Sequence, residues 1–208
     1  MPGVTPPRAR ALAALPLAAL PNVLSGMRIV LVLPFAWALL RQDHGLALWL
    51  FVVAALTDGL DGWLARRFGW QSQLGGLLDP AADKLLVAVS VSLFAWLDLV
   101  PVWVAAVVLG RDIVIVLGAL YFRWRIGQVA WGASVLGKAS TAAQLLLILT
   151  VLVVAGPAWQ WSGATHTLLE LASLLLAWAV ALLALASGLD YVRTWSLHAA
   201  RRRRGTQP

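Results

Sequence analysis

Six long apolar runs make up most of this 208-residue chain, and they restrict it to one kind of fold. A membrane-spanning helix needs roughly 20 apolar residues, and the runs lie close to that length, at residues 22–40, 46–66, 75–99, 102–122, 138–154 and 167–189. Hydrophobic residues make up 61% of the chain and charged residues only 12%, which excludes an ordinary soluble domain. We therefore predict an all-α integral membrane protein, a single domain over residues 1–208 with six transmembrane helices.

The first twenty residues carry a different signal from the six runs. Arg8 and Arg10 precede an Ala/Leu-rich run that resembles a secretory signal. Pro16 and Pro21 interrupt that run, and the first long apolar run follows at once. We expect residues 1–20 to form an amphipathic juxtamembrane helix on the membrane surface rather than a cleaved signal.

The basic residues indicate how the runs cross the membrane. If the spans alternate, most arginines fall on one side, and they do so at positions 8, 10, 66, 67, 123, 125, 193 and 201–204. Arg41 falls in a loop on the other side. Cytoplasmic loops carry the Lys/Arg excess, so we expect a multi-pass inner (cytoplasmic) membrane protein whose termini face the cytoplasm, with residues 191–208 as a basic cytoplasmic tail.

Charge and cysteine content exclude several classes of function. The chain has no cysteine, which rules out disulfides and thiolate metal sites. Its formal net charge of +7 comes from residues at the ends of apolar runs. That placement favours an anionic membrane surface as the partner, and we expect no nucleic acid.

Four aspartates lie close together around the junction of the second and third runs, at Asp58, Asp61, Asp79 and Asp83. Spacings of three and four residues place each pair on one face of a helix. The segment between the pairs is short enough to let the two helices fold against each other. Carboxylates so close together repel strongly unless cations lie between them. The pattern therefore predicts two bound divalent metal ions and makes the Asp58–Asp83 region the candidate active site, at the cytoplasmic face.

Small residues and an arginine accompany these aspartates. Gly62 and Ala65 share a helical stripe with Asp58 and Asp61 and leave room for a ligand beside the backbone, while Arg66 supplies a planar cation suited to phosphate. Oxygen ligands of high charge favour Mg²⁺ or Mn²⁺ over zinc. Two such ions commonly clamp a phosphoryl group, and a carboxylate partly free of metal can act as general base. A purely structural role suits one intramembrane aspartate better than four.

The same segment resembles the signature of the CDP-alcohol phosphatidyltransferase family, D-x2-D-G-x2-A-R-x8-G-x3-D-x3-D. Its eight fixed positions are filled here by Asp58, Asp61, Gly62, Ala65, Arg66, Gly75, Asp79 and Asp83. A signature of that length is a specific signal. The resemblance implies six membrane helices behind an amphipathic N-terminal helix, and a homodimer.

The resemblance also implies an activity, in which a phosphatidyl group passes from CDP-diacylglycerol to an alcohol and CMP is released, as a step of phospholipid biosynthesis. The four aspartates would hold two divalent cations, Mg²⁺ or Mn²⁺, and Asp83 would also deprotonate the acceptor hydroxyl. The cytidine diphosphate would be bound by Asp61, Gly62, Ala65, Arg66 and Gly75.

The identity of the acceptor depends on other basic residues. Residues 21–28, PNVLSGMR, look like the P-N-x-L-[ST]-x-x-R segment of members that make phosphatidylglycerol phosphate or cardiolipin. Arg111 in the fourth run and Lys138 and Lys84 near the metal site favour an acceptor that carries a phosphate. Our first choice is glycerol 3-phosphate, as in phosphatidylglycerophosphate synthases. The pair Arg111-Asp112 is more like the cardiolipin synthases that use phosphatidylglycerol, and it also fits a local ion pair.

A cation transporter is the alternative from a different class, because carboxylates within membrane helices can also form an ion path. Transporters more often place such groups near the membrane midplane and show internal repeats or broken helices. This chain gathers its carboxylates near one face, and we detect no repeat. The sequence therefore favours the enzyme.

Overall fold

The computed structural model describes residues 20–68, 75–126, 135–156 and 163–204. This part of the chain is all-helical and contains no strands. Its helices are α2 (Leu20–Leu40), α3 (His44–Phe68), α4 (Gly75–Trp96), α5 (Val102–Ile126), α6 (Val135–Ala155) and α7 (Gly163–Arg204). The predicted all-α class is confirmed, and each predicted run lies almost wholly within one helix. The expected surface helix of residues 1–20 lies outside the described residues, apart from Leu20.

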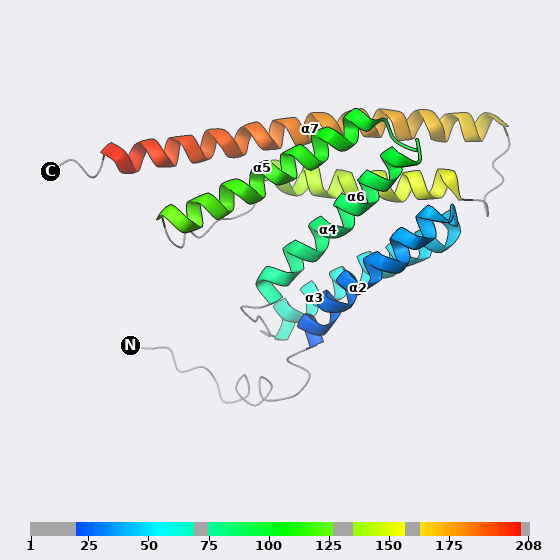
Figure 1. Ribbon diagram of the computed structural model, residues 1–208, viewed down its shortest axis with the longest axis horizontal. Coiled ribbons are helices and arrows are strands. Elements are labelled where there is room, and N and C mark those ends of the chain that lie inside the picture. Colours follow the sequence, from blue (N-terminus) through cyan, green and yellow to red (C-terminus); the bar gives the residue numbers. More distant parts are fainter. Residues whose placement is uncertain (1–19, 69–74, 127–134, 157–162, 205–208) are drawn as a thin grey trace. The chain divides into compact units, whose positions relative to one another are not determined.

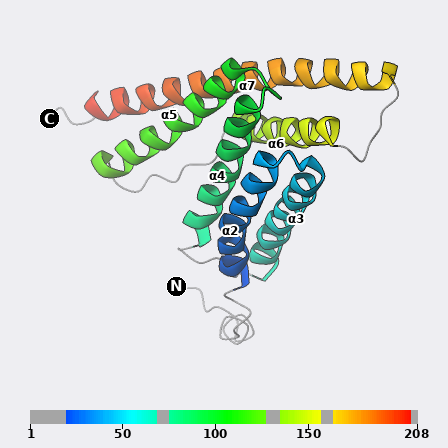
Figure 2. The ribbon, with the colours of Figure 1, turned by 45° about the vertical axis from the view of Figure 1, so that its right-hand side comes forward.

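The helices belong to two compact units along the chain. The first unit contains α2, α3 and most of α4, and the second contains α5, α7 and most of α6. In the first unit α2 and α3 lie side by side in both ribbon views (Figures 1 and 2). In the second unit α5 lies along α7.

Helices α2 and α3 pack through buried stripes with helical spacing. On α2 the stripe runs through Val32, Phe35 and Leu39, and on α3 it runs through Ala47, Phe51 and Ala54. The rings of Phe35 and Phe51 meet at 6.3 Å between centroids, within the range of favourable aromatic pairs. Alanines on α3 let the two backbones approach, because small residues favour close helix contact in membranes.

A tight turn joins α2 to α3 and sets the angle between them. The N–H of Asp43 donates to the carbonyl of Ala38 at 2.9 Å, and that of Gln42 donates to the carbonyl of Leu39 at 2.9 Å. Gln42 has a φ of 57°, so the end of α2 is a Schellman motif. Asp43 then caps α3, since its Oδ1 accepts the N–H of Leu46 at 3.0 Å.

In the second unit, α5 and α7 meet along a seam of small and aromatic side chains. Trp103 and Trp178 contact each other with ring centroids 4.4 Å apart. The seam of α7 continues through buried small residues at Ala177, Ala181, Ala184 and Ser187. Its spacing of three and four residues is the pattern by which membrane helices pack closely.

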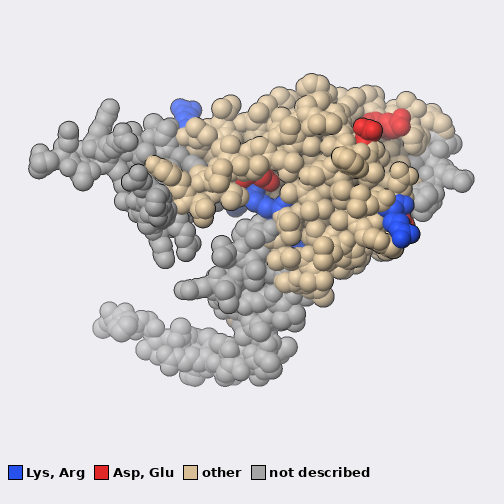
Figure 3. All heavy atoms as spheres, in the orientation of Figure 1, with Lys and Arg blue, Asp and Glu red and all other residues tan. Residues whose placement is uncertain are grey.

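The outward faces of the helices are apolar. Large hydrophobic side chains are exposed at three- and four-residue intervals along α2 (Met27, Val30, Leu33, Trp37, Leu40), α3 (Leu46, Trp49, Val53, Leu56, Leu60) and α7 (Leu168, Leu171, Leu175, Trp178, Leu182, Leu185, Leu189). Figure 3 shows how few of the described residues on one face are charged. Soluble monomers rarely expose such patches.

Among the described residues, two helical segments are long and apolar enough to cross a membrane by length and composition. They are Val135–Ala155 and Gly163–Thr194, with mean hydropathies of 1.9 and 2.3. Shorter apolar segments occupy Gly26–Leu40 and His44–Leu60.

Candidate functional site

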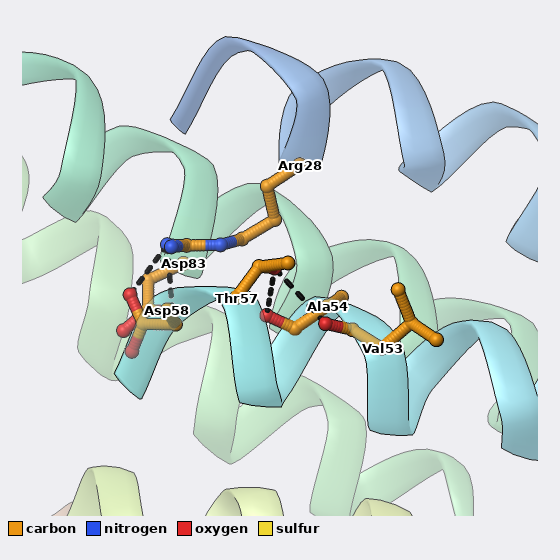
Figure 4. A network of polar contacts seen from close by, with 6 residues as sticks. All are labelled: Arg28, Val53, Ala54, Thr57, Asp58 and Asp83. Atoms are coloured by element: carbon orange, nitrogen blue, oxygen red, sulfur yellow. Dashed lines mark hydrogen bonds and ion pairs between the residues drawn. The ribbon is translucent and has the colours of Figure 1, made fainter. Parts of the chain in front are cut away.

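Two of the predicted aspartates converge on a single arginine. Figure 4 shows Arg28 of α2 reaching Asp58 of α3 and Asp83 of α4. Its Nη1 lies 2.6 Å from Oδ1 of Asp58 and 3.7 Å from Oδ1 of Asp83. The two carboxylate oxygens therefore cannot lie farther apart than the sum of these distances. The structure brings together two residues that are 25 positions apart in the sequence.

The three side chains differ sharply in exposure. The side chain of Arg28 is 0% exposed, whereas those of Asp58 and Asp83 are 40% and 32% exposed. The guanidinium is thus enclosed by the protein, whereas both carboxylates present accessible surface. The site combines a buried cation with two partly exposed anions.

Helix geometry explains how these side chains reach one point. Arg28 lies four residues before Val32 and so extends the buried stripe of α2. Asp58 lies four residues after Ala54 and extends the buried stripe of α3. Packing of α2 on α3 therefore brings Arg28 and Asp58 together, and α4 contributes Asp83 next to the buried Ala82.

Thr57 precedes Asp58, and its hydroxyl hydrogen-bonds to the backbone of α3 itself. Its Oγ1 donates to the carbonyl of Ala54 at 2.8 Å and lies 3.0 Å from that of Val53 (Figure 4). A hydroxyl bonded to its own helix does not compete for the neighbouring charges. Arg28 is thus the partner that the structure gives to Asp58.

The other residues of the signature lie in the same two helices. The α3 helix continues through residues 61–66 and α4 begins at Gly75. The side chains of Asp61, Ala65, Arg66 and Asp79, and the surroundings of Gly62 and Gly75, lie outside the described residues. Among the side chains that are described, no three acidic, histidine or cysteine groups gather into a metal cluster. The roles expected for these six residues stay predictions.

Asp58 and Asp83 suit a divalent cation by their chemistry. Carboxylate oxygens are the ligands that Mg²⁺ and Mn²⁺ prefer. The two groups come from different helices, lie close together and are both partly exposed. These described residues therefore fit the expected metal.

The three lysine and arginine residues expected to contact the acceptor lie in different surroundings. Lys84 follows Asp83 on α4 and is half-buried, and Lys138 is exposed in the first turn of α6. Arg111 is buried in α5. Its Nη1 donates to Oδ1 of Asp112 at 2.6 Å, and its Nη2 donates to Oγ of Ser187 on α7 at 2.9 Å.

The contacts of Arg111 correspond to the local ion pair that the sequence allowed. Both terminal nitrogens of the guanidinium are engaged by protein groups. Gly188 lies beside the same side chain, because a Cβ built there would be 3.6 Å from Cγ of Arg111. Arg111 therefore joins α5 to α7, whatever else it binds.

Sequence reasoning missed the role of Arg28. That residue was noted only as the last position of the segment PNVLSGMR. One signal could have indicated this role. Arg28 is a single arginine within an apolar helix, and such a residue needs an acidic partner. Spacing within one helix cannot identify a partner on another helix, so the contact with Asp58 and Asp83 was not predicted.

Comparison with known proteins gives a consistent result. A family model described as CDP-alcohol phosphatidyltransferase matches residues 18–185. The matched part includes all eight positions of the signature from Asp58 to Asp83, and also Arg28, Arg111 and Lys138.

Individual relatives carry two kinds of name. The chain is 37% identical over 107 residues to human "Cardiolipin synthase (CMP-forming)", covering 51% of this chain and 36% of the human protein. It is 34% identical to the protein of the same name from Streptomyces coelicolor, covering 67% of each. It is 33% identical to "Probable phosphatidylglycerophosphate synthase" of Mycobacterium tuberculosis, covering 85% of this chain and 81% of that protein. The match spans only about a third of the length of the human and rat relatives.

Proposed function

The chain belongs to the CDP-alcohol phosphatidyltransferase family, and on that premise we propose that it transfers a phosphatidyl group from CDP-diacylglycerol to an alcohol. The observation that supports this most directly is the convergence of Asp58 and Asp83, the first and last positions of the signature. Membership of an enzyme family also favours catalysis over cation transport. The product released would be CMP.

The proposed reaction is a displacement at phosphorus. The acceptor oxygen forms a bond to the phosphatidyl phosphorus, the bond from that phosphorus to the oxygen of CMP breaks, and CMP leaves with the electron pair. Asp83, whose side chain is partly exposed, takes the proton from the acceptor hydroxyl as general base. Two divalent cations held by Asp58, Asp61, Asp79 and Asp83 would supply charge neutralisation on the phosphates.

The remaining signature residues would hold the nucleotide. Gly62, Ala65 and Gly75 would let the cytidine diphosphate approach the helix backbones. Arg66 would pair with a phosphate, since a guanidinium matches phosphate oxygens in a planar, two-point contact. Asp61 would contribute to this site as well as to the metals.

For the acceptor we propose glycerol 3-phosphate. Lys138 and Lys84 are the lysines that we expect to contact its phosphate, and the M. tuberculosis relative whose name indicates this class matches most of the chain. The second candidate is a cardiolipin synthase reaction with phosphatidylglycerol. The names of the human and Streptomyces relatives favour it, as does the Arg111–Asp112 pair.

We also propose that the protein is a single membrane domain in which all six helices cross the bilayer. The exposed apolar stripes of α2, α3 and α7 support contact with lipid on each of these helices. The distribution of arginines supports cytoplasmic termini and a cytoplasmic active site. Assembly as a homodimer rests on the family resemblance.

An acceptor panel tests the function. Purified protein is mixed with CDP-diacylglycerol, Mg²⁺ or Mn²⁺ and one acceptor (glycerol 3-phosphate, phosphatidylglycerol or serine), and CMP release is followed. We expect release with glycerol 3-phosphate. Release with phosphatidylglycerol alone would make the protein a cardiolipin synthase, and a folded protein that releases no CMP with any acceptor would contradict the proposal.

The role of Asp83 is tested by Asp83→Asn, which keeps the shape of the side chain and removes its charge. We expect the rate of CMP release to fall by about 100-fold or more, because a general base typically contributes that much. The matched control is Asp98→Asn, the same change at an exposed residue in the turn before α5. Asparagine tolerates the positive φ of 57° at that position, so the control should keep its activity. An Asp83→Asn variant as fast as the unmodified protein would show that Asp83 is not the base.

A further inference from the structure

Arg28 is the most deeply buried charged group in the described part of the chain. Its side chain has no exposed surface, and it lies in an otherwise apolar stretch of α2. A charge placed there is costly unless it is paired. Pairing with Asp58 offsets this cost, since Nη1 of Arg28 lies 2.6 Å from Oδ1 of Asp58. The same Nη1 lies 3.7 Å from Oδ1 of Asp83.

Exposure distinguishes Arg28 from a residue that binds substrate. The side chains of Asp58 and Asp83 are 40% and 32% accessible, so a ligand can contact them. The side chain of Arg28 is 0% exposed and offers no surface that a ligand can touch. Arg28 can therefore keep its contacts while the accessible carboxylate surface is occupied.

We propose that Arg28 is a positioning residue for the metal site, a buried counter-ion that holds Asp58 of α3 and Asp83 of α4 at the separation a divalent ion requires. This inference rests on the proposed function, because it assumes that these two aspartates bind metal. It adds a third helix, α2, to a site whose signature lies entirely in α3 and α4.

Charge repulsion explains why such a residue is needed. Before metal binds, two carboxylates at short range repel each other and favour separation of α3 from α4. A guanidinium close to both carboxylates offsets this repulsion with two attractions before the metal binds. Groups that orient metal ligands in this way typically contribute a factor of 10 to 100 in metal affinity.

The test is Mn²⁺ binding by the purified protein, measured by electron paramagnetic resonance without substrate. Arg28→Met keeps the length of the side chain but removes its charge, and we expect it to weaken Mn²⁺ binding about 10-fold or more. Arg28→Lys keeps the charge but loses the planar guanidinium. We therefore expect the Mn²⁺ affinity of this variant to lie between those of the unmodified protein and of Arg28→Met. The matched control is Arg41→Met just after α2, where Arg41 is exposed and lies 4.9 Å from the ring of Trp37. That control should bind Mn²⁺ normally.

A folding defect is separated from a positioning effect by thermal unfolding of each variant in a chelator. If Arg28→Met does not fold, Arg28→Lys carries the test, with weaker Mn²⁺ binding by a folded protein as the supporting result. Normal or tighter Mn²⁺ binding by a folded Arg28 variant overturns the proposal. If the unmodified protein releases no CMP but binds Mn²⁺ in a way that depends on Arg28, the failure lies in the proposed function and the inference stands.

Discussion

Arg111 and Asp112 show at the scale of single residues how a mostly apolar helix carries two buried opposite charges. Both are 8% exposed and adjacent in α5, with Nη1 and Oδ1 only 2.6 Å apart. Removing one partner of a buried pair leaves an uncompensated charge, which costs more than the pair itself contributes. Ser187 adds a hydrogen bond to the same guanidinium at 2.9 Å.

This arrangement predicts an order of stabilities. Asp112→Asn keeps the shape of the side chain but removes the counter-charge, and it should lower the free energy of unfolding by about 3 kcal/mol. Ser187→Ala removes one hydrogen bond to a charged group and should cost less, about 1.5 kcal/mol. Unfolding in detergent mixtures, followed by tryptophan fluorescence, gives both values. An Asp112→Asn variant of unchanged stability would mean that another group neutralises Arg111.

At the scale of helices, the seam between α5 and α7 depends on small residues. Gly188 of α7 lies against Arg111, and a Cβ there would meet Cγ of Arg111 at 3.6 Å, an ordinary van der Waals distance. Glycine in a helix interior is less favourable than alanine by up to about 1 kcal/mol. The space at this position therefore accommodates one methyl group, but a larger side chain would contact Arg111 too closely.

Two substitutions at Gly188 test this packing. Gly188→Ala should raise the free energy of unfolding by up to about 1 kcal/mol, since it gains helix propensity without a clash. Gly188→Leu should lower it by about 1–3 kcal/mol, because the longer side chain must displace Arg111 or α5. Equal stability of the two variants in the same unfolding assay would show that the seam is not closely packed there.

The helices were largely predictable from sequence, because their boundaries depend on local properties. Apolar length and turn residues place the first two runs at 22–40 and 46–66, against helices of Leu20–Leu40 and His44–Phe68. The last run ends at residue 189 whereas α7 continues to Arg204. Hydropathy marks where the apolar run ends, and α7 continues because neither glycine nor proline follows residue 189 until Gly205.

The candidate site was predictable only in part. The spacing of Asp58 and Asp83 within the signature identified them as candidate site residues. Their shared contact with Arg28 depends on how three helices pack, and periodicity within one helix carries no information about that. Similarly, the sequence left open whether Arg111 binds a ligand or a neighbour, and the contact with Ser187 comes from a helix 76 positions away.

At the scale of the whole molecule, the length of α7 bears on how the chain meets the membrane. Its 42 residues correspond to about 63 Å at 1.5 Å per residue, about twice the 30 Å hydrocarbon core of a bilayer. A helix of this length cannot lie wholly within the hydrocarbon if it crosses a bilayer once along the normal. In the proposed topology its last turns would lie beyond the hydrocarbon, where the four arginines at 201–204 can meet anionic lipid headgroups.

The orientation of the chain is testable because it contains no cysteine, so a single introduced thiol reports one position. In the proposed topology the turn between α2 and α3 faces away from the cytoplasm, and the C-terminal tail faces it. Gln42→Cys lies at an exposed position in that turn. It should react with a membrane-impermeant maleimide added to spheroplasts, because the outer face of the inner membrane is accessible in them. Thr206→Cys, beyond the basic run, should react only after the membrane is permeabilised.

The unmodified protein is the control for both cysteine variants, since it has no thiol to label. Each variant must also release CMP at the unmodified rate, so that the topology measured is that of the active protein. Labelling of both positions without permeabilisation would place both sites outside and contradict an odd number of crossings between them. The reverse pattern, with Thr206→Cys accessible and Gln42→Cys protected, would invert the protein. It would also require the arginine excess to face outward, against the electrostatic preference from which the orientation was inferred.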